Sequence, residues 1–356
     1  MFLATVIGLV ACGGGSSGST PTTSVPSTVP ETTTTVSPST LPETTTTTIP
    51  VPVMPLTGLP VVDEAAAVRP AIVAKIDNHP GARPQGGLNS ADIVYEENVE
   101  KWTRFAAVFH STGSDPVGPL RSGRTQDIDL VTSLNKPLFL WSGGNASVTS
   151  AIGKSSLVNM SASAASNGGG FFRSTDKKAP HNLFSKTTNI WALDGGRGGT
   201  PPPQFTYRDA STGVTGTEVA GLKLTMDGSM RAAWRWNADT GKFLRFHDST
   251  PHADAEGSQV AFDNVVVIQC EYTISAADPR SPEAQTVGTG PVWVYSAGQM
   301  TEGTWNRPDN MSPWNLEDSK GNPIGLTPGR TWVELIRAGQ AVVVPAGSDF
   351  DAVAWP

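Results

Sequence analysis

Residues 71–76 read Ala-Ile-Val-Ala-Lys-Ile, a short apolar run that is rich in β-branched side chains. Runs of this kind predict buried strands. In the first half of the chain they are residues 71–76, 92–95, 104–109 and 138–141. Ile128, Val131 and Leu134 fall on one face of a predicted helix, which Ser122 or Thr125 would cap. Strands that alternate with helical stretches favour an α/β or α+β layer.

The second half of the chain is richer in strand signals. They are residues 222–226, 233–236, 243–246, 265–268, 292–295, 332–336 and 342–344, and residues 237–242 predict a hairpin turn. Short strands at this spacing favour a sandwich, a barrel or a curled sheet. The Gly- and Pro-rich residues 168–217 predict a loop region between the halves. We therefore expect an α+β (or α/β) fold, with a mixed-sheet domain over residues 55–205 and a β-rich domain over residues 206–356.

The first twelve residues are apolar and end in Leu9-Val10-Ala11-Cys12, which resembles a bacterial lipobox. In that motif the cysteine is acylated and becomes the mature N-terminus. Residues 1–12 are therefore expected to be a signal segment, with Cys12 as the lipidation site. No Lys or Arg precedes Cys12, whereas a signal peptide has a cationic n-region. The alternatives are a start that lies upstream, or an exported chain that carries no lipid.

The segment that follows, residues 13–54, is of low complexity. Between Thr20 and Thr48, 14 of 29 residues are Thr and five are Pro. Such a tract has too little apolar surface to offset the entropy of ordering the chain. We expect a disordered stalk that lifts the folded part off a membrane. Thr beside Pro also makes O-glycosylation of the stalk a hypothesis.

The composition excludes several classes of protein. The 356 residues carry a formal net charge of −7 and a pI near 5.3, which argues against a nucleic-acid surface. Two cysteines in a chain of this length exclude a disulfide framework and a Cys-rich zinc module. Cys270, in an apolar run, is expected to be a buried thiol. No Walker loop or His-Glu-x-x-His motif occurs, so the sequence predicts no cofactor and no metal.

Several short motifs occur along the chain in a set order. They are Pro55-Leu-Thr-Gly58, Ala82-Arg-Pro-Gln85, Val117-Gly-Pro-x-Arg121-Ser-x-Arg124, Ala179-Pro-His-Asn182, Leu244-Arg-Phe246 and Pro251-His-x-Asp254. Together they resemble the YerB-like lipoprotein family of bacteria, over nearly all of residues 55–340. The resemblance implies a domain of unknown function in two parts, usually behind a lipobox. It implies no particular reaction or ligand.

Arginines dominate the candidate binding site. Arg121, Ser122 and Arg124 precede the predicted helix, whose N-terminal N–H groups would help them hold a phosphate or carboxylate. Arg83 and Arg104 would converge there if their strands are neighbours. The alternative is a structural role in ion pairs. The carboxylates available for such pairs are Asp127, Asp129, Glu96 and Glu97.

Two loops supply further candidate ligand-binding residues. Asp77, Asn78 and His79 follow a predicted strand, and His181 and Asn182 lie in the mid-chain loop region. A rigid sheet presents its binding groups on such loops.

A set of carboxylates offers a catalytic alternative. Its members are Asp77, Asp92, Glu96, Glu97 and Glu100. Two acids that face one cleft could hydrolyse a glycosidic bond, but the adjacent Glu96 and Glu97 would point to opposite faces of a strand. Exposed Trp rings could stack on sugars, whereas Trp in strands bounded by Gly and Pro, such as Trp305 and Trp332, is more often core.

These observations favour a cell-surface lipoprotein, extracytoplasmic and anchored to the cell membrane at Cys12. It would bind an anionic or saccharide envelope component through the arginine-rich site in its first domain. The partner would be a cell-wall glycan, a phosphate-bearing ligand or an envelope protein, and not a nucleic acid. The alternatives are an enzyme that acts on cell-wall polymers and a protein-interaction scaffold in the envelope.

The lipobox can be tested by labelling. Cells that express the full chain and take up a clickable fatty acid should label it, and Cys12→Ser should lose the label because serine offers no thiol to acylate. Cys270→Ser is the matched control and should keep the label, since that cysteine is expected to be buried. Persistent labelling of Cys12→Ser would contradict the lipobox.

Overall fold

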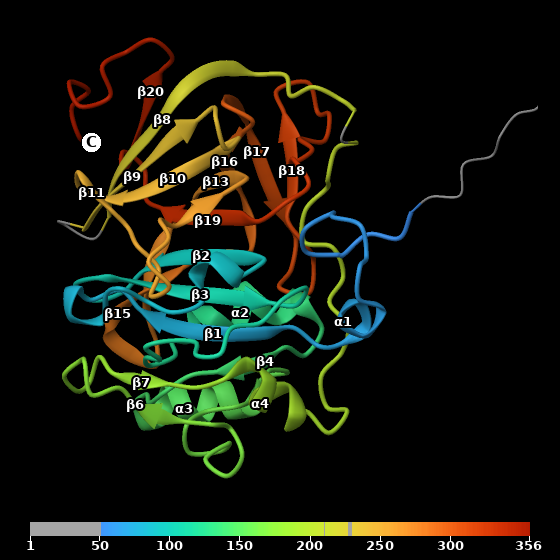
Figure 1. Cartoon of the computed structure of the whole chain (residues 1–356), viewed down its shortest axis with the longest axis vertical. Coiled ribbons are helices and arrows are strands. Elements are labelled where there is room, and N and C mark those ends of the chain that lie inside the picture. Colours follow the sequence, from blue (N-terminus) through green and yellow to red (C-terminus); the bar gives the residue numbers. More distant parts are fainter. Residues whose placement is uncertain (1–50, 210, 227–229) are drawn as a thin grey trace, which may run out of the picture. The chain divides into compact units, whose positions relative to one another are not determined.

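The computed structural model describes residues 51–209, 211–226 and 230–356 (Figure 1). The expected lipidation site Cys12 and most of the expected stalk lie outside these residues. Within them, Val53 forms a β-bridge with Pro60, and Met54 is buried. Regular structure therefore begins slightly before the expected residue 55.

Sixteen strands form one large mixed sheet. Those from the first half of the chain are β1 Ile72–Asp77, β2 Ile93–Asn98, β3 Thr103–Phe109, β4 Leu138–Leu140 and β5 Val158–Asn159. Those from the second half are β8 Thr217–Met226, β9 Met230–Asn237, β10 Lys242–His247, β11 Thr250–Pro251, β12 Ala261–Phe262, β13 Asn264–Gln269, β16 Gly288–Ser296, β17 Gln299–Arg307, β18 Asn315–Asp318, β19 Thr331–Ile336 and β20 Ala341–Pro345.

The remaining elements are short. Two hairpins stand apart from the large sheet: β6 Phe172–Arg173 with β7 Leu183–Phe184, and β14 Tyr272–Ser275 with β15 Asp278–Ala284. The α-helices are α1 Glu64–Val68, α2 Gln126–Val131, α3 Ala146–Lys154 and α4 Thr187–Ala192, and the 3-10 turns are η1 Pro80–Ala82, η2 Leu88–Ser90 and η3 Thr132–Leu134.

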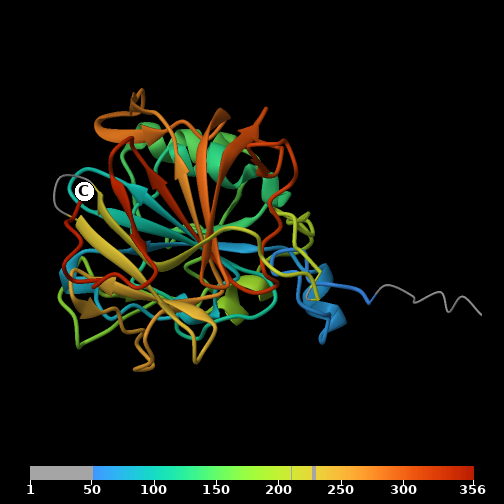
Figure 2. The same cartoon turned by 90° about the horizontal axis from the view of Figure 1, so that it is seen from above.

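The strand order joins the two halves of the chain. The main path runs β11-β10-β9-β8-β17-β16-β13-β19-β2-β3-β1-β4-β5, and it twists into a fan when seen from above (Figure 2). Strand β19 lies between β13 and β2 and is parallel to both. The sheet is therefore continuous across the halves that we expect to be domains, and the described residues form one compact unit. The boundary near residue 205 stays a prediction.

Every strand predicted from the sequence is present, and so is the hairpin turn between β9 and β10. The sheet with few helices confirms the α+β expectation. The mid-chain residues 168–217 differ from the expected loop, because they contain the β6–β7 hairpin and α4. Leu183 and Ile190 of these elements are only 8% and 0% exposed. Such short elements carry too few apolar side chains to show a period among the surrounding Gly and Pro residues.

Apolar side chains cover both faces of the sheet. In β1, Ile72, Ala74 and Ile76 pack into one core cluster, and Val73 packs into the other. Successive side chains of a strand point to opposite faces, so a strand that is covered on both sides reads as one continuous apolar run. Trp305 and Trp332 are 2% and 0% exposed, which agrees with their core interpretation.

A buried ion pair lies at the seam between the halves. Arg245 of β10 places its Nη2 2.6 Å from Oε2 of Glu96 in β2, and neither side chain is exposed. Glu334 of β19 is the register neighbour of Glu96. Burial and the nearby Glu96 raise the pKa of Glu334 well above its usual value, which favours the protonated form of Glu334 beside the Arg245–Glu96 pair.

Two buried histidines complete the seam. Arg245 Nη1 donates to His252 Nδ1 at 2.8 Å, because a guanidinium has only donors. His252 Nε2 therefore carries the ring proton and donates to Gln85 Oε1 at 2.9 Å. Burial and the charge of Arg245 lower the pKa of both His247 and His252 far below the usual value. Both rings are neutral in the folded chain.

Breaking the Arg245–Glu96 pair should cost much stability. Arg245→Met leaves a buried carboxylate without its cation and should lower the free energy of unfolding by about 3–5 kcal/mol, measured by urea denaturation. Arg280→Met is the matched control, since Arg280 pairs with Asp278 while its own side chain is 81% exposed. That variant should lose less than about 1 kcal/mol. Equal losses in the two variants would refute the special role of the buried pair.

The neutral histidines predict a loss of stability in acid. Below a pH of about 6.5 the unfolded chain protonates His252 while the folded chain does not, so the free energy of unfolding falls as the pH falls. His252→Gln should flatten this fall between pH 6 and 4.5 by about 1.4 kcal/mol per pH unit, one proton's share. Because the comparison is with the wild type, groups common to both chains cancel. Parallel stability curves would contradict the assignment.

Candidate functional site

The end of β1 gathers polar side chains from four segments. The pairing of β1 with β3 sets Arg104 directly opposite Asp77. Leu120 bridges to Ile76, and its N–H donates to the Leu183 carbonyl at 2.6 Å. These two contacts bring the segments that carry Arg121 and His181 to the same strand end.

The loop after β1 is fixed by its own side chains. Asp77 Oδ1 accepts the His79 N–H at 3.1 Å, and His79 Nδ1 accepts the Gly81 N–H at 3.0 Å. Asn78 is buried and donates to Thr103 Oγ1 at 2.7 Å. The loop therefore holds Asp77 and His79 in set orientations without help from a ligand.

Asp77 is the centre of the site. Its Oδ2 lies 2.6 Å from His181 Nδ1 and 3.2 Å from Arg121 Nε. The first contact is a hydrogen bond, and the second is an ion pair whose geometry leaves Arg121 Nε without a hydrogen-bond partner among the described residues. The Asp77 side chain is 5% exposed, whereas those of His181 and Arg121 are 17% and 26% exposed. The histidine and the arginine therefore face solvent while the carboxylate anchors them.

These side chains line a pocket of about 170 Å³. Its lining residues are Asp77, His79, Val99, Glu100, Lys101, Trp102, Arg104, Arg121 and His181. Among them are three cations and two carboxylates, so the lining carries an excess positive charge even when both histidines are neutral. The pocket thus suits a small anion.

Three aromatic rings pack against one another in the pocket wall. The rings of His79 and His181 stack 4.0 Å apart, and Trp102 meets His79 edge-on at 5.3 Å. Burial and the neighbouring His181 lower the pKa of His79.

Burial and Arg124 lower the pKa of Arg104 to about 10, which still leaves its guanidinium charged at neutral pH. Arg104 and Arg121 are therefore both available as cations.

The structure separates the arginines that the sequence suggested as one set. Arg124 is held by contacts within the protein, because its Nε donates to Glu100 and to Ser281, each at 2.9 Å. Arg83 lies away from the pocket, where its guanidinium donates to the Asn78 carbonyl at 3.0 Å. Only Arg104 and Arg121 of the four line the pocket.

The other predicted residues support the site rather than line it. The Ser122 carbonyl accepts a hydrogen bond from Arg104 Nη1 at 3.1 Å. Asn182 braces the mid-chain loop through Arg173, Ser174 and Lys177. Asn78 fastens the loop after β1 to β3.

The expected anion site at the helix N-terminus is not formed. Helix α2 has six residues, and Asp127 Oδ2 accepts the Arg124 N–H at 2.6 Å. Asp127 thus occupies the terminus from within the chain. The adjacent Glu96 and Glu97 do point to opposite faces, where Glu96 pairs with Arg245 and Glu97 with Lys75. Neither glutamate reaches the pocket.

Sequence reasoning missed Trp102, Lys101 and Gln85. The first two lie in the turn between β2 and β3 and line the pocket. Gln85 Nε2 donates to the Asp77 carbonyl at 3.0 Å. An amide in a short loop motif gives no sign of such a contact, because its partners come from distant parts of the chain.

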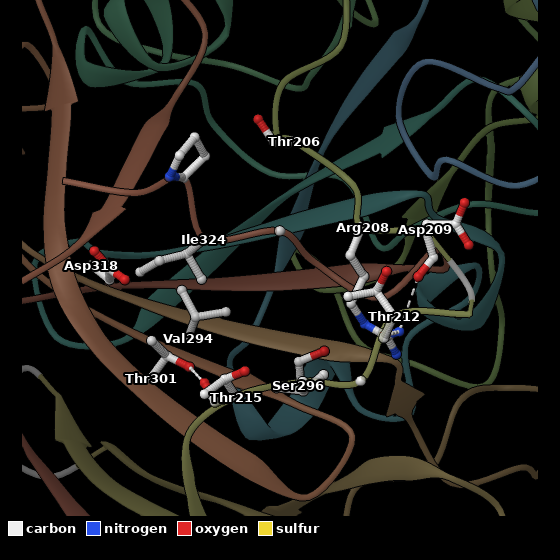
Figure 3. A pocket seen from close by; sticks show the side chains of 14 residues that line it. Thr206, Arg208, Asp209, Thr212, Thr215, Val294, Ser296, Thr301, Asp318 and Ile324 are labelled. Atoms are coloured by element: carbon white, nitrogen blue, oxygen red, sulfur yellow. Dashed lines mark hydrogen bonds between the residues drawn. The ribbon is translucent and has the colours of Figure 1, made fainter. Parts of the chain in front are cut away.

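Some other cavities are larger. One of about 380 Å³ lies beside β16 and β17, with hydroxyl groups of threonine and serine around Ile324 (Figure 3). Its charged side chains are occupied nearby: Arg208 donates to Thr327 Oγ1 at 2.9 Å, and Asp318 accepts from the Asn322 N–H. Another, of about 430 Å³, is lined by Arg83, His247 and His252. Its histidines are the neutral ones of the seam.

Two further findings concern the described residues as a set. No three His, Cys, Asp or Glu side chains gather there as a metal site would require. None of the helices in that part of the chain is long and apolar enough to cross a membrane.

Cys270 is a free, buried thiol, as expected, and burial raises its pKa to about 12.

Relatives of this chain are found by sequence and by structure. The protein of Bacillus subtilis named "Putative lipoprotein YerB" is 27% identical over 291 residues, which cover 79% of this chain and 85% of that protein. The crystal structure of YerB from Bacillus subtilis matches with a TM-score of 0.72 at 22% identity, over 82% of this chain and 99% of that chain. That structure shows the same fold.

The family match follows the two halves of the chain. Residues 56–199 match the family described as "Protein of unknown function (DUF3048) N-terminal domain", and residues 222–333 match the DUF3048 C-terminal domain. The resemblance that the sequence motifs suggested is thereby confirmed. The chain belongs to the DUF3048 family, a two-part domain of unknown function.

Proposed function

We propose that this protein is a lipid-anchored, extracytoplasmic lipoprotein that binds an anionic group of an envelope component in the pocket at the end of β1. The excess positive charge of the pocket lining is the observation that carries the binding proposal. The lipobox at Cys12 and the name of the Bacillus subtilis relative support the location.

Arg121 is the principal anion-binding residue in this proposal. Its Nε is buried and pairs with Asp77 at 3.2 Å, while its side chain as a whole remains 26% exposed. Its planar guanidinium matches the paired oxygens of a phosphate or carboxylate. Arg104, tied to the Ser122 carbonyl, supplies the second positive charge from the opposite strand.

Trp102 suits the rest of such a ligand. It is half-buried, it lines the pocket, and its ring is held edge-on by His79. An aromatic face beside an anion site fits a sugar or polyol that carries the charged group. The ligand class is therefore a phosphate- or carboxylate-bearing glycan or polyol of the envelope.

Binding can be measured by calorimetry on the full chain, with glycerol 3-phosphate as the phosphate probe and N-acetylmuramic acid as the carboxylate probe. Arg121→Gln should weaken binding of the preferred probe about 10- to 100-fold, because a charge-assisted hydrogen bond is lost. Raised salt should weaken it as well.

The matched control is Arg231→Gln. Arg231 is an exposed arginine of β9 whose ion pair with Asp248 lies outside the pocket lining, so this variant should bind like the wild type. Equal binding by wild type and Arg121→Gln would refute the site. If the wild type bound neither probe, the proposed ligand class would be wrong.

A further inference from the structure

We propose that Asp77 and His181 form an acid–base pair, and that the pocket hydrolyses a phosphodiester with His181 Nε2 as the general base. The inference rests on the proposed anion binding and assigns it a reaction. It follows from the arrangement of two histidines, the Asp77 carboxylate and two arginines around one cavity.

The hydrogen bonds set the ring proton of His181. An ionised carboxylate can only accept, so Nδ1 of His181 donates to Asp77 Oδ2 at 2.6 Å. A neutral ring with its proton on Nδ1 carries a lone pair on Nε2. No described residue hydrogen-bonds to that Nε2, although the ring lines the pocket. A carboxylate that orients a histidine in this way is the usual support of a general base.

His79 is a positioning residue for this base. Its Nδ1 accepts the Gly81 N–H, and its ring stacks on His181 at 4.0 Å with planes 9° apart. The lowered pKa of His79 favours the neutral form of this ring, which stacks on His181 without adding a positive charge next to the base. His181 is thus held between Asp77 and His79.

The charge of the pocket favours a diester over a monoester. The lining has an excess of one positive charge with both histidines neutral, and a phosphodiester carries a single negative charge. Arg104 and Arg121 would face the two non-bridging oxygens, where charge grows in the transition state. A phosphodiester of a glycan or polyol is also compatible with Trp102 at the pocket wall.

The step balances with water alone. A water oxygen attacks phosphorus, a new P–O bond forms, and the bond to the leaving oxygen breaks. The water proton passes to His181 Nε2. The leaving alkoxide keeps the electron pair of the broken bond and takes a proton from solvent, and the imidazolium then returns its proton to solvent. The products are a phosphomonoester and an alcohol.

The test uses the full chain and bis(p-nitrophenyl) phosphate, whose leaving group needs no acid. His181→Gln should lower kcat about 100-fold or more and should remove the acid-side rise of the pH–rate profile, which reports deprotonation of the base. Asp77→Asn should also lower kcat, because an asparagine amide can donate to Nδ1 and move the ring proton to Nε2. Arg231→Gln is the control for preparation and should match the wild type.

Each outcome separates this inference from the binding proposal. A wild type that binds glycerol 3-phosphate yet does not turn over the diester overturns the catalytic inference and leaves binding intact. Full turnover by a folded His181→Gln variant overturns the assignment of the base. Faster turnover of p-nitrophenyl phosphate or p-nitrophenyl acetate than of the diester overturns the substrate class. If the wild type neither binds nor turns over any probe, both proposals are wrong.

Discussion

The fold depends on a cation that has been removed completely from water. The guanidinium of Arg245 is packed 4.9–5.9 Å from the rings of Phe105, Trp234 and Trp332, and Glu96 is its only ion-pair partner among the described residues. A buried charge costs several kcal/mol unless its partner lies in good geometry. Strands β10 and β2 come from different halves of the chain. The two halves must therefore pack in one particular arrangement for Glu96 to neutralise the charge of Arg245. We infer that this pair specifies how the halves join more than it adds to net stability.

The same interaction reaches the pocket. Arg245 donates to His252, His252 donates to Gln85, and Gln85 donates to the Asp77 carbonyl, over distances of 2.8, 2.9 and 3.0 Å. Every residue that lines the pocket comes from the first half of the chain. The backbone of its central residue, Asp77, is nevertheless linked through Gln85 and His252 to Arg245 in a strand of the second half. A first half expressed alone would keep the pocket residues and lose this support.

The sequence predicts the strands well because both faces of the sheet are buried. Residues 71–76 are apolar at nearly every position, and a short, continuous apolar run is typical of a strand covered on both faces. Lys75 within that run gives no sign that it is fully buried between Glu97 and Asp127. The sequence also gives no sign of which arginines line the pocket and which are held by other contacts within the protein. Arg124 is occupied by Ser281, which is 157 residues away in sequence, and no local pattern encodes such a contact.

The burial of each cation follows from the cost of removing its charge from water. Lys75 and Arg245 are 0% exposed, and each has a carboxylate at hydrogen-bond distance, since an unpaired charge in the core would be too costly. Arg121 Nε is buried against Asp77, but the arginine side chain as a whole is 26% exposed, so its charge is partly solvated by water. An anionic ligand would replace that water with a charge-assisted contact at little cost in desolvation. The pocket is thus where this chain can keep a partly solvated cation within reach of a ligand without destabilising its fold.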